Sequence, residues 1–158
     1  MKFNSTEITR YFTLLVGIAF LAAGIGGFIP FFTPPAPADA PQLTIHANYG
    51  LLLGLFPVNL VHNIFHFGVG VFGLLSFRAH ESAKRFCKFL GITLGVLTVM
   101  GMIPQLNTVF GTWPLYGHAI WLHGVEAVIG RGLLSCAQPS AAPGRPRRTV
   151  TSTARTMR

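Results

Sequence analysis

LFPVNLVHNIFHFGVG, the segment Leu55–Gly70, sets four polar side chains into a run of sequence that is otherwise apolar. They are two asparagines and two histidines, Asn59, His62, Asn63 and His66. Polar side chains are costly in hydrocarbon, and those that a membrane span keeps serve helix packing, ligand binding or a permeation path. A spacing of three or four residues places such side chains on or near one face of a helix. The segment therefore indicates a membrane helix with a polar face.

The composition of the whole chain is typical of a membrane protein. Of the 158 residues, 51% are hydrophobic and 10% are charged, whereas a soluble domain carries about 25% charged residues. Four apolar stretches reach the roughly 18–20 residues that a helix needs to cross about 30 Å of hydrocarbon. They are approximately Tyr11–Pro30, Val58–Phe77, Phe86–Ile103 and Leu115–Leu134. We expect an all-α integral membrane protein with four transmembrane helices.

The distribution of the twelve lysine and arginine residues indicates the topology. Lys2 and Arg10 precede the first apolar stretch, a group within 78–88 surrounds the junction of the second and third, and the others end or follow the fourth. The two remaining loops, 31–57 and 104–114, contain no lysine or arginine. By the positive-inside rule, both termini then face the cytoplasm. The net charge of +8 is thus a topology signal, and no nucleic-acid partner is expected.

The chain divides by composition into three parts. Residues 1–10 form a short cytoplasmic N-terminus, and residues 11–134 form the four-helix membrane domain. Residues 135–158 are mainly Ser, Ala, Pro, Thr and Arg with little to bury, so a disordered, basic cytoplasmic tail is expected. Cys87 and Cys136 fall near cytoplasmic helix ends, where a reducing compartment favours free thiols.

Short motifs recur at matching positions and indicate an internal repeat. The pairs are Gly17-Ile18 with Gly91-Ile92, Gly27-Phe-Ile-Pro30 with Gly101-Met-Ile-Pro104, and Gly54-Leu-Phe-Pro57 with Gly111-Thr-Trp-Pro114. His66 lies nine residues beyond Pro57, and His123 lies nine residues beyond Pro114. The repeats, about residues 11–77 and 86–134, each contain two spans and therefore have the same orientation. Two parallel two-helix repeats imply a two-fold axis along the membrane normal.

Local signals predict where the first two helices begin. Ser5 or Thr6 is expected to cap the first helix. The prolines of segment 31–41 favour extended chain after it, and Leu43–Phe56 is expected to lie at or in the outer membrane interface. Pro57 is expected to begin the second helix, because proline suits the first helical turn.

The histidines form a candidate metal site. His62 and His66 are four residues apart, which suits two metal ligands on one helix face. His123 of the second repeat offers a third nitrogen and Glu126 an oxygen, and His66 with His123 are candidate ligands of a tetrapyrrole. A carboxylate near mid-bilayer is costly, so Glu126 is expected to be protonated, hydrogen-bonded or paired, with His123 and Asn63 as candidate partners.

Two other uses of the same residues remain open. Hydrogen bonds between helices fix packing in membrane bundles and average about 0.6 kcal/mol. The candidate helix-packing cluster comprises Asn59, His62, Asn63, His66, His123 and Glu126. Glu126 is alternatively the centre of a proton or substrate path. Stripes of small residues, Ala19-Ala23-Gly27 and Gly91-Gly95, predict closely packed helices in either case.

No motif of a soluble enzyme occurs in the sequence, which lacks a Walker loop, a dinucleotide fingerprint, a GxSxG elbow and an HExxH helix. We expect a small multi-pass membrane protein without enzymatic activity, acting as a structural or accessory component. The alternatives are a metal or tetrapyrrole binder through His62, His66 and His123, or a small transporter that uses Glu126. The expected partners are the lipid bilayer and either a larger membrane complex or a second copy of the chain.

The segment from Gly54 to His66, followed by Gly70 and Gly73, closely resembles the hallmark of a bacterial membrane-protein family, domain of unknown function 4383. The resemblance extends over about residues 8–134 and includes His123 in the second half. There the chain departs from the family pattern, with Tyr116, Ala119 and Ile120 where Asn, Asp and Asn are usual. The resemblance implies a four-helix fold in a bacterial inner or thylakoid membrane. It implies no assigned activity.

Overall fold

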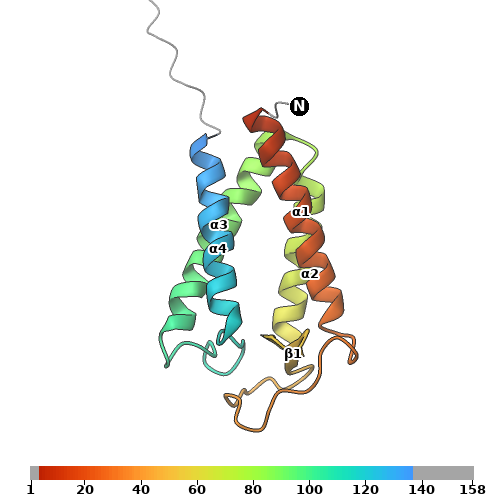
Figure 1. Cartoon of the computed structure of the whole chain (residues 1–158), viewed down its shortest axis with the longest axis vertical. Coiled ribbons are helices and arrows are strands. Elements are labelled where there is room, and N and C mark those ends of the chain that lie inside the picture. Colours follow the sequence, from red (N-terminus) through yellow and green to blue (C-terminus); the bar gives the residue numbers. More distant parts are fainter. Residues whose placement is uncertain (1–3, 137–158) are drawn as a thin grey trace, which may run out of the picture.

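The computed structural model describes residues 4–136, which form four helices and one small β-hairpin (Figure 1). In chain order the elements are α1 Ser5–Gly26, β1 Gly50–Leu52, β2 Phe56–Val58, α2 Leu60–Ser76, α3 His80–Met102 and α4 His118–Cys136. The expectation of an all-helical architecture with four helices is confirmed. The hairpin was not expected from the sequence. Of the tail predicted for residues 135–158, residues 135 and 136 belong to α4 instead. The rest of it, residues 137–158, lies outside the described residues.

Helix α1 begins at a capping box, and the predicted cap at Ser5 or Thr6 is wrong. Asn4 is the N-cap, and its side-chain oxygen accepts a hydrogen bond of 2.9 Å from the backbone N–H of Glu7. The Glu7 carboxylate accepts in turn from the backbone N–H of Asn4 at 3.1 Å. Two N–H groups that the helix itself leaves unpaired are satisfied in this way. Ser5 and Thr6 therefore lie inside the helix and do not cap it.

Pro57 does not begin α2, because it belongs to strand β2. In the antiparallel hairpin Leu51 lies opposite Pro57, and the N–H of Leu51 donates outward to the carbonyl of Pro34 at 2.9 Å. Alternate pairs in an antiparallel ladder exchange no hydrogen bonds, so proline is tolerated at this position. Asn59 is the N-cap of α2 instead, accepting from the N–H of His62 at 3.1 Å.

The helices are arranged as two pairs, α1 with α2 and α3 with α4 (Figure 1). Glycine allows the close approach within the first pair, since a Cβ atom at Gly70 would lie 2.5 Å from the backbone nitrogen of Leu21. Gly73 faces Gly17 in the same way: a Cβ atom at Gly73 would lie 2.7 Å from the Cα atom of Gly17. In the second pair, a Cβ at Gly91 would lie 2.9 Å from the Arg131 side chain. The prediction of close packing through small residues is confirmed for these helices.

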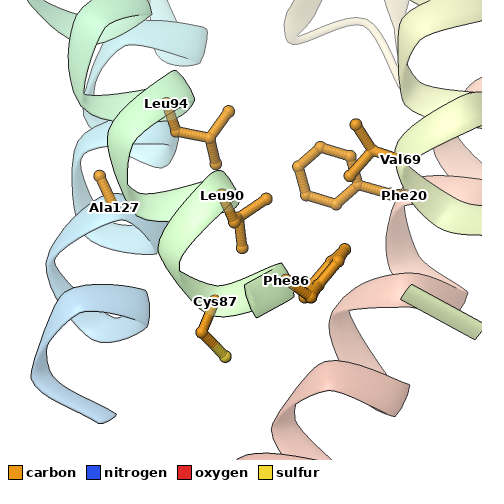
Figure 2. Packing of buried hydrophobic residues seen from close by; sticks show 7 residues of the cluster. All are labelled: Phe20, Val69, Phe86, Cys87, Leu90, Leu94 and Ala127. Carbon is orange, nitrogen blue, oxygen red and sulfur yellow. The ribbon is translucent and has the colours of Figure 1, made fainter. Parts of the chain in front are cut away.

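An apolar core joins the two pairs. Figure 2 shows Leu90 and Leu94 of α3 extending toward Phe20 of α1 and Val69 of α2. Phe86 is fully buried beside them. The Cys87 thiol is also buried, 3.6 Å from the hydroxyl of Thr13, and is a free cysteine as expected.

The outward faces of the helices are apolar. Exposed side chains include Leu15 on α1, Leu75 on α2, Val99 on α3 and Val128 on α4, each at least 58% exposed. Among the described residues, α1 and α3 are long and apolar enough to cross a membrane, while α2 is a shorter apolar helix. Such contiguous exposed apolar surface is typical of contact with lipid or with a partner protein.

The two loops that the repeat prediction aligns share an unusual backbone conformation. Leu53 and Gly54 have φ angles of 55° and 71°, and Phe110 and Gly111 have φ angles of 56° and 84°. A non-glycine residue with positive φ is uncommon, and here one precedes the aligned glycine in both loops. This likeness is expected of a duplicated element.

Candidate metal site

Three histidine side chains from two helices converge at one point. His62 and His66 come from successive turns of α2, and His123 comes from α4. One ring nitrogen of each lies within 4.8 Å of the others. The Nε2 atoms of His62 and His66 are 3.1 Å apart, and the His123 ring lies 5.9 Å and 6.4 Å from the two rings between centroids. The structure thus brings together the three nitrogens that the sequence analysis proposed as ligands.

Asn59 fixes the beginning of α2 and connects it to both outer loops. Its side-chain nitrogen donates to the carbonyl of Ile45 at 3.1 Å and to that of Thr112 at 2.9 Å, while its oxygen caps α2. The residue is completely buried, and its side-chain nitrogen and oxygen are both hydrogen-bonded. The helix-packing interpretation therefore fits Asn59. Its side chain is not on the face that His62 and His66 present.

Asn63 also faces away from the histidines. A Cβ atom at Gly27 would overlap the Asn63 side chain, which places that side chain against the end of α1. Its amide nitrogen and oxygen are buried without a hydrogen-bond partner among residues 4–136. Asn63 is thus not the partner of Glu126 that the sequence suggested.

The histidine rings are held by aromatic neighbours and keep nitrogens free. Trp113 packs against His62 at 5.2 Å between ring centroids, and Phe20 packs edge-on against His66 at 5.0 Å. The Pro57 carbonyl interacts with the His62 ring, but its geometry does not amount to a hydrogen bond. The Nδ1 atoms of His62 and His66 are accordingly buried without a hydrogen bond within the described chain. The 3.1 Å contact within the cluster joins the Nε2 atoms, so an ion held there would leave these Nδ1 atoms without a partner among the described residues.

The three histidines line a half-open cavity of about 570 Å³ between α1, the hairpin, α2 and α4. Most of its other lining residues are apolar, among them Phe20, Ala23, Leu52, Phe56 and Leu122. Glu126 is the one acidic residue among the lining residues; it lies one turn beyond His123 on α4 and is half-buried. No hydrogen bond or ion pair of Glu126 occurs within residues 4–136. The predicted pairing of Glu126 with His123 is not formed.

The nitrogen positions fit a single metal ion better than a tetrapyrrole. Two nitrogens that bind one Zn²⁺ at about 2.0–2.1 Å lie roughly 3.3 Å apart at the tetrahedral angle and about 3 Å apart at a right angle. The 3.1 Å between the Nε2 atoms of His62 and His66 falls between these values. A tetrapyrrole needs its two axial ligands on opposite faces of the macrocycle. The Nε2 atoms of His62 and His66, 3.1 Å apart on one face of α2, cannot bind opposite faces of one macrocycle.

The sequence pattern did not reveal two contributions to the site. Trp113 lies in the loop before α4 and contacts His62 of α2, where the two helix pairs meet. Phe20 of α1 contacts His66 within the α1–α2 pair. The hairpin residues Leu52 and Phe56 form part of the cavity wall. The Gly54-Leu-Phe-Pro57 motif is the sequence signal for this wall, because the motif forms the turn and second strand of the hairpin that precedes α2.

Fold and site together define a small all-helical protein with apolar outer faces, at least two helices suited to crossing a membrane, and a buried histidine cluster between its helix pairs. The family model of a domain of unknown function (DUF4383) matches residues 10–135. The chain therefore belongs to this family, and no activity is assigned by that membership. No curated protein and no solved structure matches the chain.

Proposed function

We propose that this protein is a four-span membrane protein that binds one divalent transition-metal ion through His62, His66 and His123. It acts as a non-enzymatic binding component of the membrane. The observation that carries the proposal is the convergence within 4.8 Å of three ring nitrogens from α2 and α4, two from buried histidines and one from the half-buried His66. Imidazole nitrogen suits Zn²⁺, Co²⁺, Ni²⁺ and Cu²⁺, and three such ligands are typical of zinc sites that keep one open position.

The membrane placement rests on two independent features. Apolar side chains are exposed on the outer faces of all four helices. The loops that follow α1 and α3 contain no lysine or arginine, whereas the α2–α3 connection and both ends of the chain are basic. Four spans with both termini in the cytoplasm of a bacterial inner or thylakoid membrane satisfy both features.

A purely structural role for the cluster explains the site less well. Histidines that only fix helix packing hydrogen-bond to neighbouring helices, but the one nitrogen contact within the cluster joins His62 and His66 of the same helix. Asn59 already joins the outer loops to α2 without them. An accessory role in a larger membrane complex, or self-association, is compatible with metal binding and is tested by identifying the chains that co-purify.

Metal analysis of the purified protein tests the proposal. The full chain is purified in a mild detergent, stripped with a chelator and titrated with Zn²⁺ and Co²⁺. One equivalent is expected to bind. His66→Ala and His123→Ala should each weaken binding strongly, because two nitrogens on one ion hold it less well than three.

His118→Ala is the matched control, since His118 lies on the same helix as His123 but is exposed and hydrogen-bonded to Trp121. It should leave metal binding unchanged. Binding that survives both cluster variants would refute the assignment. A porphyrin-like absorption band lost in the same variants would replace the single ion with a tetrapyrrole.

A further inference from the structure

We infer that the metal site is completed by a membrane-soluble, long-chain monocarboxylic acid, whose carboxylate binds the ion and whose alkyl chain occupies the cavity. The inference rests on the metal site proposed above and names the class of ligand that this site holds. It follows from the number of protein ligands, the charge of the site and the shape of the cavity.

The protein supplies three ligands and leaves a coordination position open. Within the described residues, the group of potential ligand atoms that lie close enough to hold one ion contains His62, His66 and His123 alone. Zinc sites with three protein ligands keep the fourth position for water or another ligand. All three rings line the cavity, so the open position of an ion held between them faces into it.

The charge of the site calls for an anion. Three neutral imidazoles leave both positive charges of the ion uncompensated in an apolar surrounding, where unpaired charge is costly. Glu126, which lines the same cavity, compensates one of them when ionised. A monoanionic ligand on the ion makes the whole assembly neutral.

The cavity suits an apolar chain attached to that anionic group. Its volume of about 570 Å³ lies within the roughly 300–1,000 Å³ that is common for small-molecule sites. Apart from the three histidines and Glu126, its walls are apolar side chains and small residues such as Ala19, Ala22 and Ala23. Two wall residues, Ile25 and Leu53, are 47% and 64% exposed, so the cavity has an open rim on the outer surface of the bundle. An amphiphile in the bilayer has access to the ion through this rim.

The Co²⁺-loaded protein provides the test, because the visible spectrum of Co²⁺ responds to a change of ligand. Palmitate, its methyl ester and acetate are titrated separately into the detergent-solubilised full chain. Palmitate is expected to change the spectrum at a concentration at least about tenfold lower than acetate, since only palmitate fills the cavity. The ester, which has no anionic oxygen, should leave the spectrum unchanged.

Variants separate the cavity from the ion. Ala23→Phe fills the cavity and is expected to weaken the palmitate response at least about tenfold while Co²⁺ still binds. Ile18→Phe is the matched control, because Ile18 is on the same helix, is 50% exposed and does not line the cavity. If Ala23→Phe fails to bind Co²⁺, Ile25→Trp at the rim takes its place.

The outcomes distinguish the two proposals. A protein that binds Co²⁺ but whose spectrum is indifferent to palmitate, or responds equally to acetate, overturns the fatty-acid inference and leaves the metal site standing. A protein that binds no metal overturns both. A palmitate response that Ala23→Phe and Ile25→Trp leave intact places the alkyl chain elsewhere and also overturns the inference.

Discussion

The side-chain nitrogen of Asn59 donates a 2.9 Å hydrogen bond to the carbonyl of Thr112, a residue 53 positions further along the chain. The bond ties the beginning of α2 to the loop that leads into α4. These are the two helices that carry His62 and His123. One buried amide therefore helps to hold the two parts of the candidate metal site together, beside the apolar core that joins the helix pairs.

Replacing Asn59 with Ala is expected to destabilise the protein by about 2–4 kcal/mol. The helix cap contributes about 0.5–2 kcal/mol, and two half-buried carbonyls lose their donor at up to about 1–3 kcal/mol each, with partial relief from water and relaxation. Unfolding in a denaturing detergent, followed by circular dichroism, measures the loss.

Asn59→Asp separates the two contributions. Aspartate keeps an oxygen that caps α2 but has no N–H group for the carbonyls of Ile45 and Thr112. We expect it to be nearly as destabilising as Asn59→Ala. An aspartate variant with the stability of the unaltered protein would show that the cap alone matters.

The glycine contacts of α2 give a second prediction, with a control on the same helix. Gly70→Ala should force α1 and α2 apart, because its Cβ would lie 2.5 Å from the Leu21 backbone. Overpacking of this kind typically costs about 1–3 kcal/mol. Gly68 has no atom within 4 Å of an added Cβ, so Gly68→Ala should be neutral or slightly stabilising. Equal unfolding midpoints for the two variants would contradict the observed packing.

The elements of this fold differ in how far the sequence predicts them. Helical spacing places His62 and His66 on one face, and the nine-residue offset from the repeated prolines relates His66 to His123 at a similar depth. Whether the three rings converge depends on how α2 packs against α4. The directions of Asn59 and Asn63 also depend on the packing. Each follows from where α2 begins, and that point is set by a hairpin whose pairing with Pro34 and Pro35 joins distant segments.

The absence of basic residues from two loops predicts which cysteines a membrane-impermeant reagent reaches from outside. In a chain carrying Cys136→Ser, a cysteine at Asp39 should react with an external maleimide in intact cells. A cysteine at Ala79 should react only after the membrane is opened. Cys87 serves as an internal control, because its buried thiol should stay unlabelled until the protein unfolds. External labelling at position 79 would reverse the proposed topology.

Metal binding should stabilise the folded protein, since the ligands come from both helix pairs and are assembled only in the native state. At a free Zn²⁺ concentration 100 times Kd, linkage gives about 2.7 kcal/mol. The expected result is a higher thermal midpoint with Zn²⁺ that a chelator reverses. His66→Ala should lose this increase and His118→Ala should keep it. Mg²⁺, which prefers oxygen ligands, should have no effect, so that an equal increase with Mg²⁺ would indicate a nonspecific ionic effect.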